Sequence, residues 1–345
     1  EVRSEWVIQV TGEVVKRPDG MDNPDLPTGE IEMDVSDFKV LNKAKTPPFY
    51  INKDENVDEA LRMRYRYMDL RRPAMQKNII LRHNVIRFIR NYLGDQNFVE
   101  IETPILFKTT PEGARDYLVP SRVHPGKFFA LPQSPQQLKQ LLMVAGYEKY
   151  FQIARCFRDE DQRGDRQPEF TQLDMEMSFV ERDDVINLME DMMTRIVEEV
   201  TDCELVTKPF PRLSHEEAMK RYGCDKPDLR YGLEIVDLSE LAGQTSFRVF
   251  TDTVAAGNPV RAICVPGCGG YSRKQVGELE DIAKNAGAKG LAWMAVQEDG
   301  SVRSSIAKFF TEEQLAALKE QAGANPNDLI LFAAGDESMV CEVLD

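Results

Sequence analysis

The sequence lacks the signatures of several common protein classes. No apolar run approaches the ~18–20 residues that a membrane-spanning helix needs, and residues 1–30 lack the basic-then-apolar pattern of a secretory signal. Neither the phosphate-binding pattern G-x-x-x-x-G-K-[ST] nor the dinucleotide-binding pattern G-x-G-x-x-G occurs. We therefore expect a protein without a membrane partner and without either of these nucleotide-binding loops.

Cysteine and histidine are both scarce. Six cysteines in 345 residues are too few and too scattered for a disulfide framework, which favours a reducing cytoplasm. The three histidines show no metal-ligand spacing with cysteine, and Cys264 and Cys268 make at best half of a zinc site. No Ser-His-Asp or Cys-His arrangement is visible, so we expect neither a metal site nor covalent catalysis in these residues.

Positive charge is in short supply overall but is concentrated in one stretch. Lys and Arg number 43 against 58 Asp and Glu, so the net charge is −15, which argues against indiscriminate binding to nucleic acid. Residues 61–90 reverse this balance, with nine Lys and Arg against the single acid Asp69. A solvated helix face and a surface that follows a phosphate backbone both account for this stretch, and the residues alone favour the solvated face.

The first third of the chain combines strand-like and helix-like patterns. Alternating runs at residues 6–15 and 30–41, separated by turns, predict the strands of a small β-barrel. Because the chain opens on a strand, we expect earlier strands to be missing from it. Residues 46–52 are typical of a linker, and residues 74–93 have the apolar spacing of an amphipathic helix.

The centre and the end of the chain alternate short strands with helices. Proline and glycine breakers between residues 98 and 180 predict an α+β fold, with an antiparallel sheet and helices. The expected strands are 98–106, 127–131, 149–154 and 169–177, and the expected helices are 135–145 and 184–200. From about residue 236 to residue 345, further strands and helices predict a separate α/β insert.

A tightly charged hairpin at residues 155–176 is the best candidate for a site. A strand, a charged loop and a return strand would direct Arg158, Asp159 and Glu160 into one space. Alternation on the return strand places Gln172, Asp174 and Glu176 on one face, and we expect these three residues to line a cleft. Polar residues that alternate inside an apolar sheet favour a cleft.

Several segments resemble known motifs of one enzyme family. The string Phe157-Arg158-Asp159-Glu160 with its return strand resembles motif 2 of the class II aminoacyl-tRNA synthetases, and residues 99–106 resemble motif 1, the dimer-interface motif. The segments that narrow the resemblance to the aspartyl-tRNA synthetases are residues 65–72, 110–117 and 132–140. Residues 287–292 are similar to the insertion domain of the bacterial type.

The resemblance implies a multi-domain organisation. It predicts a partial OB-fold that binds the anticodon at residues 1–45 and a hinge at residues 46–73. A class II catalytic core with motifs 1 and 2 would follow at residues 74–230, and a bacterial-type insertion domain at residues 231–345.

The resemblance also implies a ligase reaction and its residues. Aspartate would attack the α-phosphate of ATP, and the aspartyl group would then pass to the tRNA 3′ end. The positions that match aspartate-binding residues are Glu112, Ser134, Gln136, Lys139, Arg158 and Asp174, and those that match ATP-binding residues are Arg158, Asp159, Glu160 and Gln167. Lys139 would meet the side-chain carboxylate of aspartate, Asp174 its ammonium, and Arg158 the growing charge at the α-phosphate.

The expected partners follow from the same resemblance. They are L-aspartate, ATP, tRNA(Asp) and a second copy of the chain, which would contact Pro104; charging of tRNA(Asn) is left open. The hinge arginines expected at the tRNA are Arg64, Arg66, Arg71 and Arg72. Motif 3 and the acids that would hold Mg²⁺ do not occur in this sequence. We therefore expect a fragment of a longer enzyme that cannot activate aspartate by itself.

Two alternatives compete with this interpretation. An asparaginyl- or lysyl-tRNA synthetase would share the barrel and motif 2, although the insert and the segment 136–139 argue against it. A non-catalytic tRNA-binding or interaction protein could also retain a synthetase core. Motif 3 in frame after Asp345 in the genome would favour the enzyme, and a stop codon there would favour the non-catalytic protein.

Overall fold

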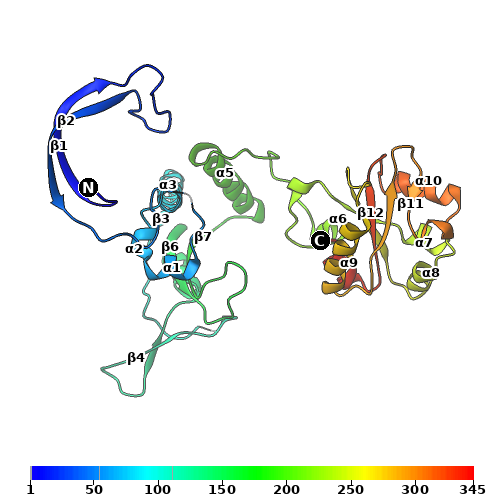
Figure 1. The fold of residues 1–345 in the computed structure, drawn as a ribbon. Helices are drawn as coiled ribbons and strands as arrows, with labels where there is room; N and C mark the ends of the chain where they lie inside the picture. The colour runs from blue at the N-terminus through cyan, green and yellow to red at the C-terminus, as the bar shows by residue number, and fades with distance from the viewer. Residues whose placement is uncertain (1, 54, 111) are drawn as a thin grey trace. The chain divides into compact units, whose positions relative to one another are not determined.

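The chain forms two compact units, Glu1–Leu205 and Val206–Asp345 (Figure 1). The computed structural model describes residues 2–53, 55–110 and 112–345. Among these residues, no helix combines the length and the apolar character that crossing a membrane requires. The finer domain bounds derived from the sequence stay predictions.

The first unit begins with a two-stranded antiparallel ribbon. Strands β1 (Val7–Lys16) and β2 (Ile31–Asn42) match the two alternating runs of the sequence. The strands lie so close at Gly12 that a Cβ atom there would be 2.1 Å from the carbonyl oxygen of Asp34, so only glycine fits. The two predicted strands are therefore confirmed. They pair only with each other among the described residues, so no closed barrel is formed there.

Two short helices follow the ribbon. They are α1 (Glu59–Arg64) and α2 (Arg66–Asp69). The carboxylate of Asp58 accepts a hydrogen bond from the backbone N–H of Leu61 and so caps the first of them. The basic stretch of the sequence therefore begins in these helices and continues into the long helix α3 (Pro73–Asp95), which starts at a proline.

A three-stranded sheet in the order β3-β6-β7 forms the centre of the first unit. Its elements are β3 (Val99–Glu100), β6 (Lys149–Phe157) and β7 (Glu169–Met177), and the helix after them is α5 (Arg182–Val200). Strands β6 and β7 are antiparallel, but β3 pairs with β6 in parallel, so the prediction of a purely antiparallel sheet is wrong. A parallel pair needs a long crossover, which the intervening residues 101–148 provide.

The remaining elements of this unit lie between β3 and β6 in the chain. They are the hairpin of β4 (Leu118–Pro120) and β5 (Phe128–Ala130) and the helix α4 (Gln136–Val144). Helix α4 packs against both β6 and β7. The expected long strand at residues 98–106 is reduced to β3, because its sheet pairing ends before the Thr103-Pro104 step.

The two faces of the β6–β7 hairpin have opposite character. One face packs with α3 and α5 in an apolar core, in which Leu93, Phe151 and Met192 are no more than 2% exposed. The alternate residues of the same strands point to the other face, which includes the paired residues Gln152 and Asp174. Alternation therefore separates the core of this unit from a polar surface under α4.

The second unit is a five-stranded sheet in the order β11-β10-β12-β9-β8, with helices on both faces. Its strands are β8 (Ile235–Asp237), β9 (Val260–Val265), β10 (Ala292–Val296), β11 (Val302–Arg303) and β12 (Leu329–Ala334). Its helices are α6 (His215–Tyr222), α7 (Ser239–Gly243), α8 (Arg248–Ala255), α9 (Arg273–Asn285), α10 (Glu312–Gln321) and α11 (Glu337–Leu344).

The strand directions of this unit differ from the α/β expectation. All four pairings in its sheet are antiparallel, so the unit is α+β. Both β9 and β10 run antiparallel to β12 between them, and are therefore parallel to each other with α9 as their crossover. The sequence predicts all three strands, but not that the last of them, β12, pairs between β9 and β10.

Candidate active site

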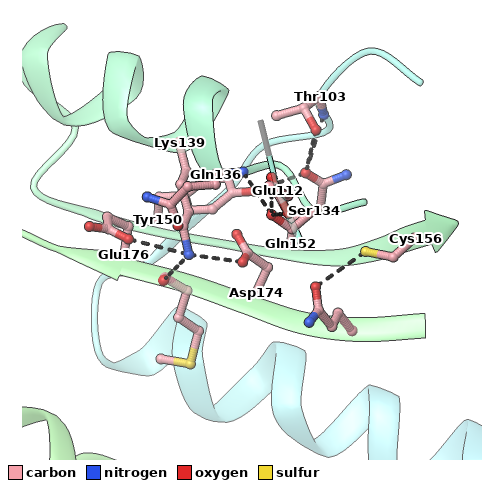
Figure 2. A network of polar contacts seen from close by, with 12 residues as sticks. Thr103, Glu112, Ser134, Gln136, Lys139, Tyr150, Gln152, Cys156, Asp174 and Glu176 are labelled. Atoms are coloured by element: carbon pink, nitrogen blue, oxygen red, sulfur yellow. Dashed lines mark hydrogen bonds and ion pairs between the residues drawn. The ribbon is translucent and has the colours of Figure 1, made fainter. Parts of the chain in front are cut away.

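A polar cluster lies on the face of the β6–β7 hairpin that α4 covers (Figure 2). The register of the two strands places Gln152 opposite Asp174 and Tyr150 opposite Glu176. Helix α4 supplies Lys139, whose ammonium group reaches the carboxylates of β7 (Figure 2). The face predicted from alternation on β7 is therefore confirmed for Asp174 and Glu176, and it continues onto β6.

Lys139 is held by three oxygen atoms. Its Nζ lies 2.9 Å from Asp174 Oδ1, 3.3 Å from Glu176 Oε2 and 3.2 Å from the carbonyl oxygen of Met175. The lysine side chain is 11% exposed and the Asp174 side chain 8%. The second carboxylate oxygen of Asp174, Oδ2, is buried and has no hydrogen-bond partner among the described residues. A buried acceptor without a donor costs free energy, so this oxygen is suited to a ligand that brings one.

Glu112 and Ser134 form a second polar pair at the same site (Figure 2). The Ser134 hydroxyl lies 3.0 and 3.1 Å from the two carboxylate oxygens of Glu112, and it accepts a hydrogen bond from the backbone N–H of Gln136 at 3.3 Å. The buried side chain of Gln133 holds the segment after Glu112 in place, because it donates to and accepts from the backbone of Ala114. Four of the predicted aspartate-binding residues therefore lie in this cluster, namely Glu112, Ser134, Lys139 and Asp174. Gln133, which was not predicted, holds the backbone beside them.

A second network, absent from the sequence prediction, lies beside Asp174. The carboxamide oxygen of Gln152 accepts hydrogen bonds from the hydroxyl of Tyr150 at 2.8 Å and from the hydroxyl and backbone N–H of Thr103 at 2.9 and 3.3 Å. Burial, reinforced by the negative charge of Asp174, raises the pKa of Tyr150, so this phenol is neutral near pH 7. Alternation on β6 could have revealed Tyr150 and Gln152.

The end of the hairpin contains a cavity of about 810 Å³ that Arg158, Glu160 and Gln167 help to line. Its size lies within the range of small-molecule sites. The guanidinium carbon of Arg158 lies 5.1 Å from the ring centre of Phe170, and Arg158 Nε is buried without a hydrogen-bond partner among the described residues. Asp159 donates from its backbone to the carbonyl of Arg115 at 3.1 Å. Three of the four predicted ATP-binding residues therefore border one space.

A buried cysteine, Cys156, lies two residues before Arg158 in the chain. Cys156 is fully buried on β6, and burial raises the pKa of its thiol to about 11, although the charge of Arg158 opposes the shift. The thiol lies 3.2 Å from the amide oxygen of Gln172 and remains protonated near neutral pH. Cys156 therefore contributes packing and a weak hydrogen bond.

Two of the predicted hinge arginines, Arg66 and Arg72, lie with Arg62 around the buried carboxylate of Asp69. Asp69 is fully buried, accepts hydrogen bonds from Arg62 at 2.9 Å and from Arg66, and pairs with Arg72 at 3.6 Å. The hydrogen bond from Arg62 is the main cause that lowers the pKa of Asp69. Arg66 and Arg72 thus have a structural partner, and their contact with tRNA stays a prediction.

The remaining residues predicted to contact tRNA or a second copy of the chain, Arg64, Arg71 and Pro104, have other neighbours. Arg71 pairs with Glu5 at 2.6 Å, and the Arg64 guanidinium lies 5.8 Å from the ring centre of Tyr65. Pro104 directly follows Thr103, in the segment after β3. Within residues 2–53, 55–110 and 112–345, no three His, Cys, Asp or Glu side chains come together as a metal site would require.

The family model and two of the relatives that match this chain carry the names of tRNA synthetases or tRNA ligases. A family model described as tRNA synthetases class II (D, K and N) matches residues 58–330. A protein of Moorella thermoacetica named aspartate–tRNA(Asp/Asn) ligase is 58% identical over 344 residues, which cover 100% of this chain and 57% of that protein. A protein of the same name from Natranaerobius thermophilus is 55% identical, over 99% of this chain and 58% of its own length. The chain thus spans less than two thirds of these relatives.

A solved structure supports the fold. The asparaginyl-tRNA synthetase of Entamoeba histolytica, in complex with asparaginyl-adenylate, matches 98% of this chain and 80% of its own with a TM-score of 0.52. Its sequence identity of 18% limits the likeness to the fold.

Proposed function

Because the chain belongs to the class II tRNA synthetases of the D, K and N group, we propose that its protein is an aspartate–tRNA ligase. The relatives that share 55–58% of its residues carry that name. In the proposed reaction, a carboxylate oxygen of L-aspartate attacks the α-phosphorus of ATP and pyrophosphate leaves. A ribose hydroxyl at the tRNA 3′ end then attacks the carbonyl carbon of aspartyl-adenylate, and AMP leaves.

The adjacent charges of Lys139 and Asp174 carry this proposal. Aspartate has one ammonium and two carboxylates, so its site needs donors and acceptors side by side. The orphaned Oδ2 of Asp174 would accept from the ammonium, and Lys139 Nζ would exchange one of its three oxygen contacts for the side-chain carboxylate. An uncharged amide at that position could accept a hydrogen bond from Lys139 but would lose the ion pair, which favours aspartate over asparagine.

Arg158 is the proposed catalytic residue. It borders the 810 Å³ cavity, and its Nε has no hydrogen-bond partner among the residues described. A guanidinium there would bridge the attacking carboxylate and the α-phosphate and would stabilise the negative charge that develops on the phosphate. Glu160 and Gln167 would hold the rest of ATP in the same cavity. Catalysis would then rest on positioning and electrostatics.

Further features of the family enter as parts of the same proposal. The β1–β2 ribbon would belong to an OB-fold that binds the anticodon, and the second unit to a bacterial-type insertion domain. Two copies would associate near Pro104, and tRNA(Asp) would contact the hinge. Mg²⁺ belongs to the same proposal, although the described residues contain no cluster of side chains that would hold it. The cytoplasm remains the predicted compartment.

The natural full-length protein allows a direct test. We expect aspartate-dependent exchange of pyrophosphate into ATP, and aspartyl transfer to purified tRNA(Asp). Asparagine and lysine, offered separately, serve as matched substrates for the sister activities. Exchange that depends on one of these amino acids, or on none, would contradict the proposal. Parallel assays with tRNA(Asn) establish whether the second tRNA is also charged.

A further inference from the structure

The carboxamide of Gln152 has a fixed orientation. Its oxygen receives three hydrogen bonds, two from Thr103 and one from Tyr150, although an amide oxygen has only two lone pairs. The backbone N–H of Thr103 can only donate, so it requires the oxygen, not the NH₂ group, to point toward it, and the two hydroxyls donate to the same oxygen. Thr103 therefore prevents the amide from turning its NH₂ group toward this position (Figure 2).

The hydroxyl of Tyr150 has two acceptors within reach but only one proton. It donates to Gln152 Oε1 at 2.8 Å, and Asp174 lies opposite Gln152 on the paired strand, close enough that its negative charge adds to burial in raising the pKa of Tyr150. Tyr150 is fully buried, so its hydroxyl cannot turn to solvent. Since Gln152 takes the proton, Asp174 Oδ2 remains without a donor.

We propose that Gln152 is a positioning residue which, held by Thr103, takes the Tyr150 proton and so keeps Asp174 Oδ2 open for the ammonium group of the amino acid. This inference rests on the proposed function. The network withholds an internal donor that would compete with the substrate. A buried carboxylate oxygen that already had a phenol donor would gain less from an ammonium.

The substitution Gln152→Met tests this role, because methionine has a similar volume and only a weak acceptor. The Tyr150 hydroxyl would then donate to Asp174. We expect the KM for aspartate to rise about 10-fold, in line with a hydrogen bond to a charged group, while kcat and the KM for ATP change less than about 3-fold. Adding Tyr150→Phe removes the competing donor, so the double variant should return to within about 3-fold of the wild-type KM.

A purely structural role predicts the opposite sign. Two cavity or packing defects would add, and the double variant would bind aspartate no better than Q152M. That result, or an unchanged KM in Q152M, would overturn the inference. If the wild-type protein shows no aspartate-dependent exchange, the proposed function and this inference are both overturned. If the wild type is active but the effects of the two substitutions on KM add, only the role of Gln152 is overturned.

A second variant covers the case in which Q152M does not fold. Thr103→Val removes one of the donors that orient Gln152 while keeping the side-chain shape, and it should raise the aspartate KM about 3-fold. The matched control is Thr201→Val, whose hydroxyl bonds the carbonyl of Val197 at the end of α5. Equal aspartate KM values for these two variants would contradict the role of Gln152. Thermal unfolding of each variant verifies that it is folded.

Discussion

The two faces of the β6–β7 hairpin differ in how fully their groups are satisfied. On one face, Phe151 packs with Leu93 of α3 and Met192 of α5, and all three residues are no more than 2% exposed. On the other, Lys139 and Asp174 form a buried ion pair that leaves one carboxylate oxygen without a donor. The same two strands thus carry an apolar core on one face and a polar site on the other. The free energy gained from apolar burial offsets the cost of the unsatisfied carboxylate oxygen.

The largest expected effect concerns the stability that the apolar face provides. Leu93 of α3 is fully buried in this core, so Leu93→Ala should reduce the free energy of unfolding by about 2–5 kcal/mol. Denaturant titration measures this loss. Val185→Ala on α5, where the side chain is 41% exposed, is the control and should change it by no more than about 0.5 kcal/mol. A small loss in Leu93→Ala would mean that this face is not the core of the unit.

Replacing Arg158 tests the polar face where it meets the cavity. Arg158→Ala in the full-length protein should slow aspartate-dependent exchange by about 10²–10³, because a donor to the developing charge is removed. Arg182→Ala is the control, since that arginine is exposed and pairs with its neighbour Asp183. An effect of less than about tenfold would contradict the catalytic role, and unfolding curves of both variants exclude a general loss of structure.

Lys139 should affect binding more than catalysis. Lys139→Leu removes the cation that would meet the side-chain carboxylate, and we expect the KM for aspartate to rise about 10- to 100-fold with little change in the KM for ATP. Lys149→Leu at the start of β6 provides a comparison, because the Lys149 ammonium donates to the carbonyl of Gln96 instead of to the site. An unchanged aspartate KM in Lys139→Leu would reject this assignment.

Local patterns were enough to predict much of this arrangement. Strand β7 has the predicted bounds, α4 lies within the predicted helix, and alternation correctly places Asp174 and Glu176 on one face. The family resemblance pointed to Glu112, Ser134 and Lys139, which the structure brings together with Asp174. These features depend on periodicity within one element or on short motifs.

Long-range pairings were not predictable in the same way. The parallel partner of β6, strand β3, is separated from it by residues 101–148, and no local pattern specifies its direction. Similarly, the bond between Thr103 and Gln152 joins residues 49 positions apart. Tyr150 and Gln152 are polar residues in an apolar strand, yet only the register with β7 shows that they adjoin Asp174.

The smallest expected effect comes from a substitution at Ile153, one residue along β6 from Gln152. It is the most selective test, because the two neighbouring side chains point to opposite faces of the strand. Ile153 follows Gln152 and points to the apolar face, where it packs against the core of α3 and α5. Ile153→Val removes one methylene group and should lower the free energy of unfolding by about 0.5–1.5 kcal/mol. The aspartate KM should stay within twofold of wild type, in contrast to Q152M. A change of more than threefold would mean that packing on one face sets binding on the other, and the two faces could no longer be treated as independent.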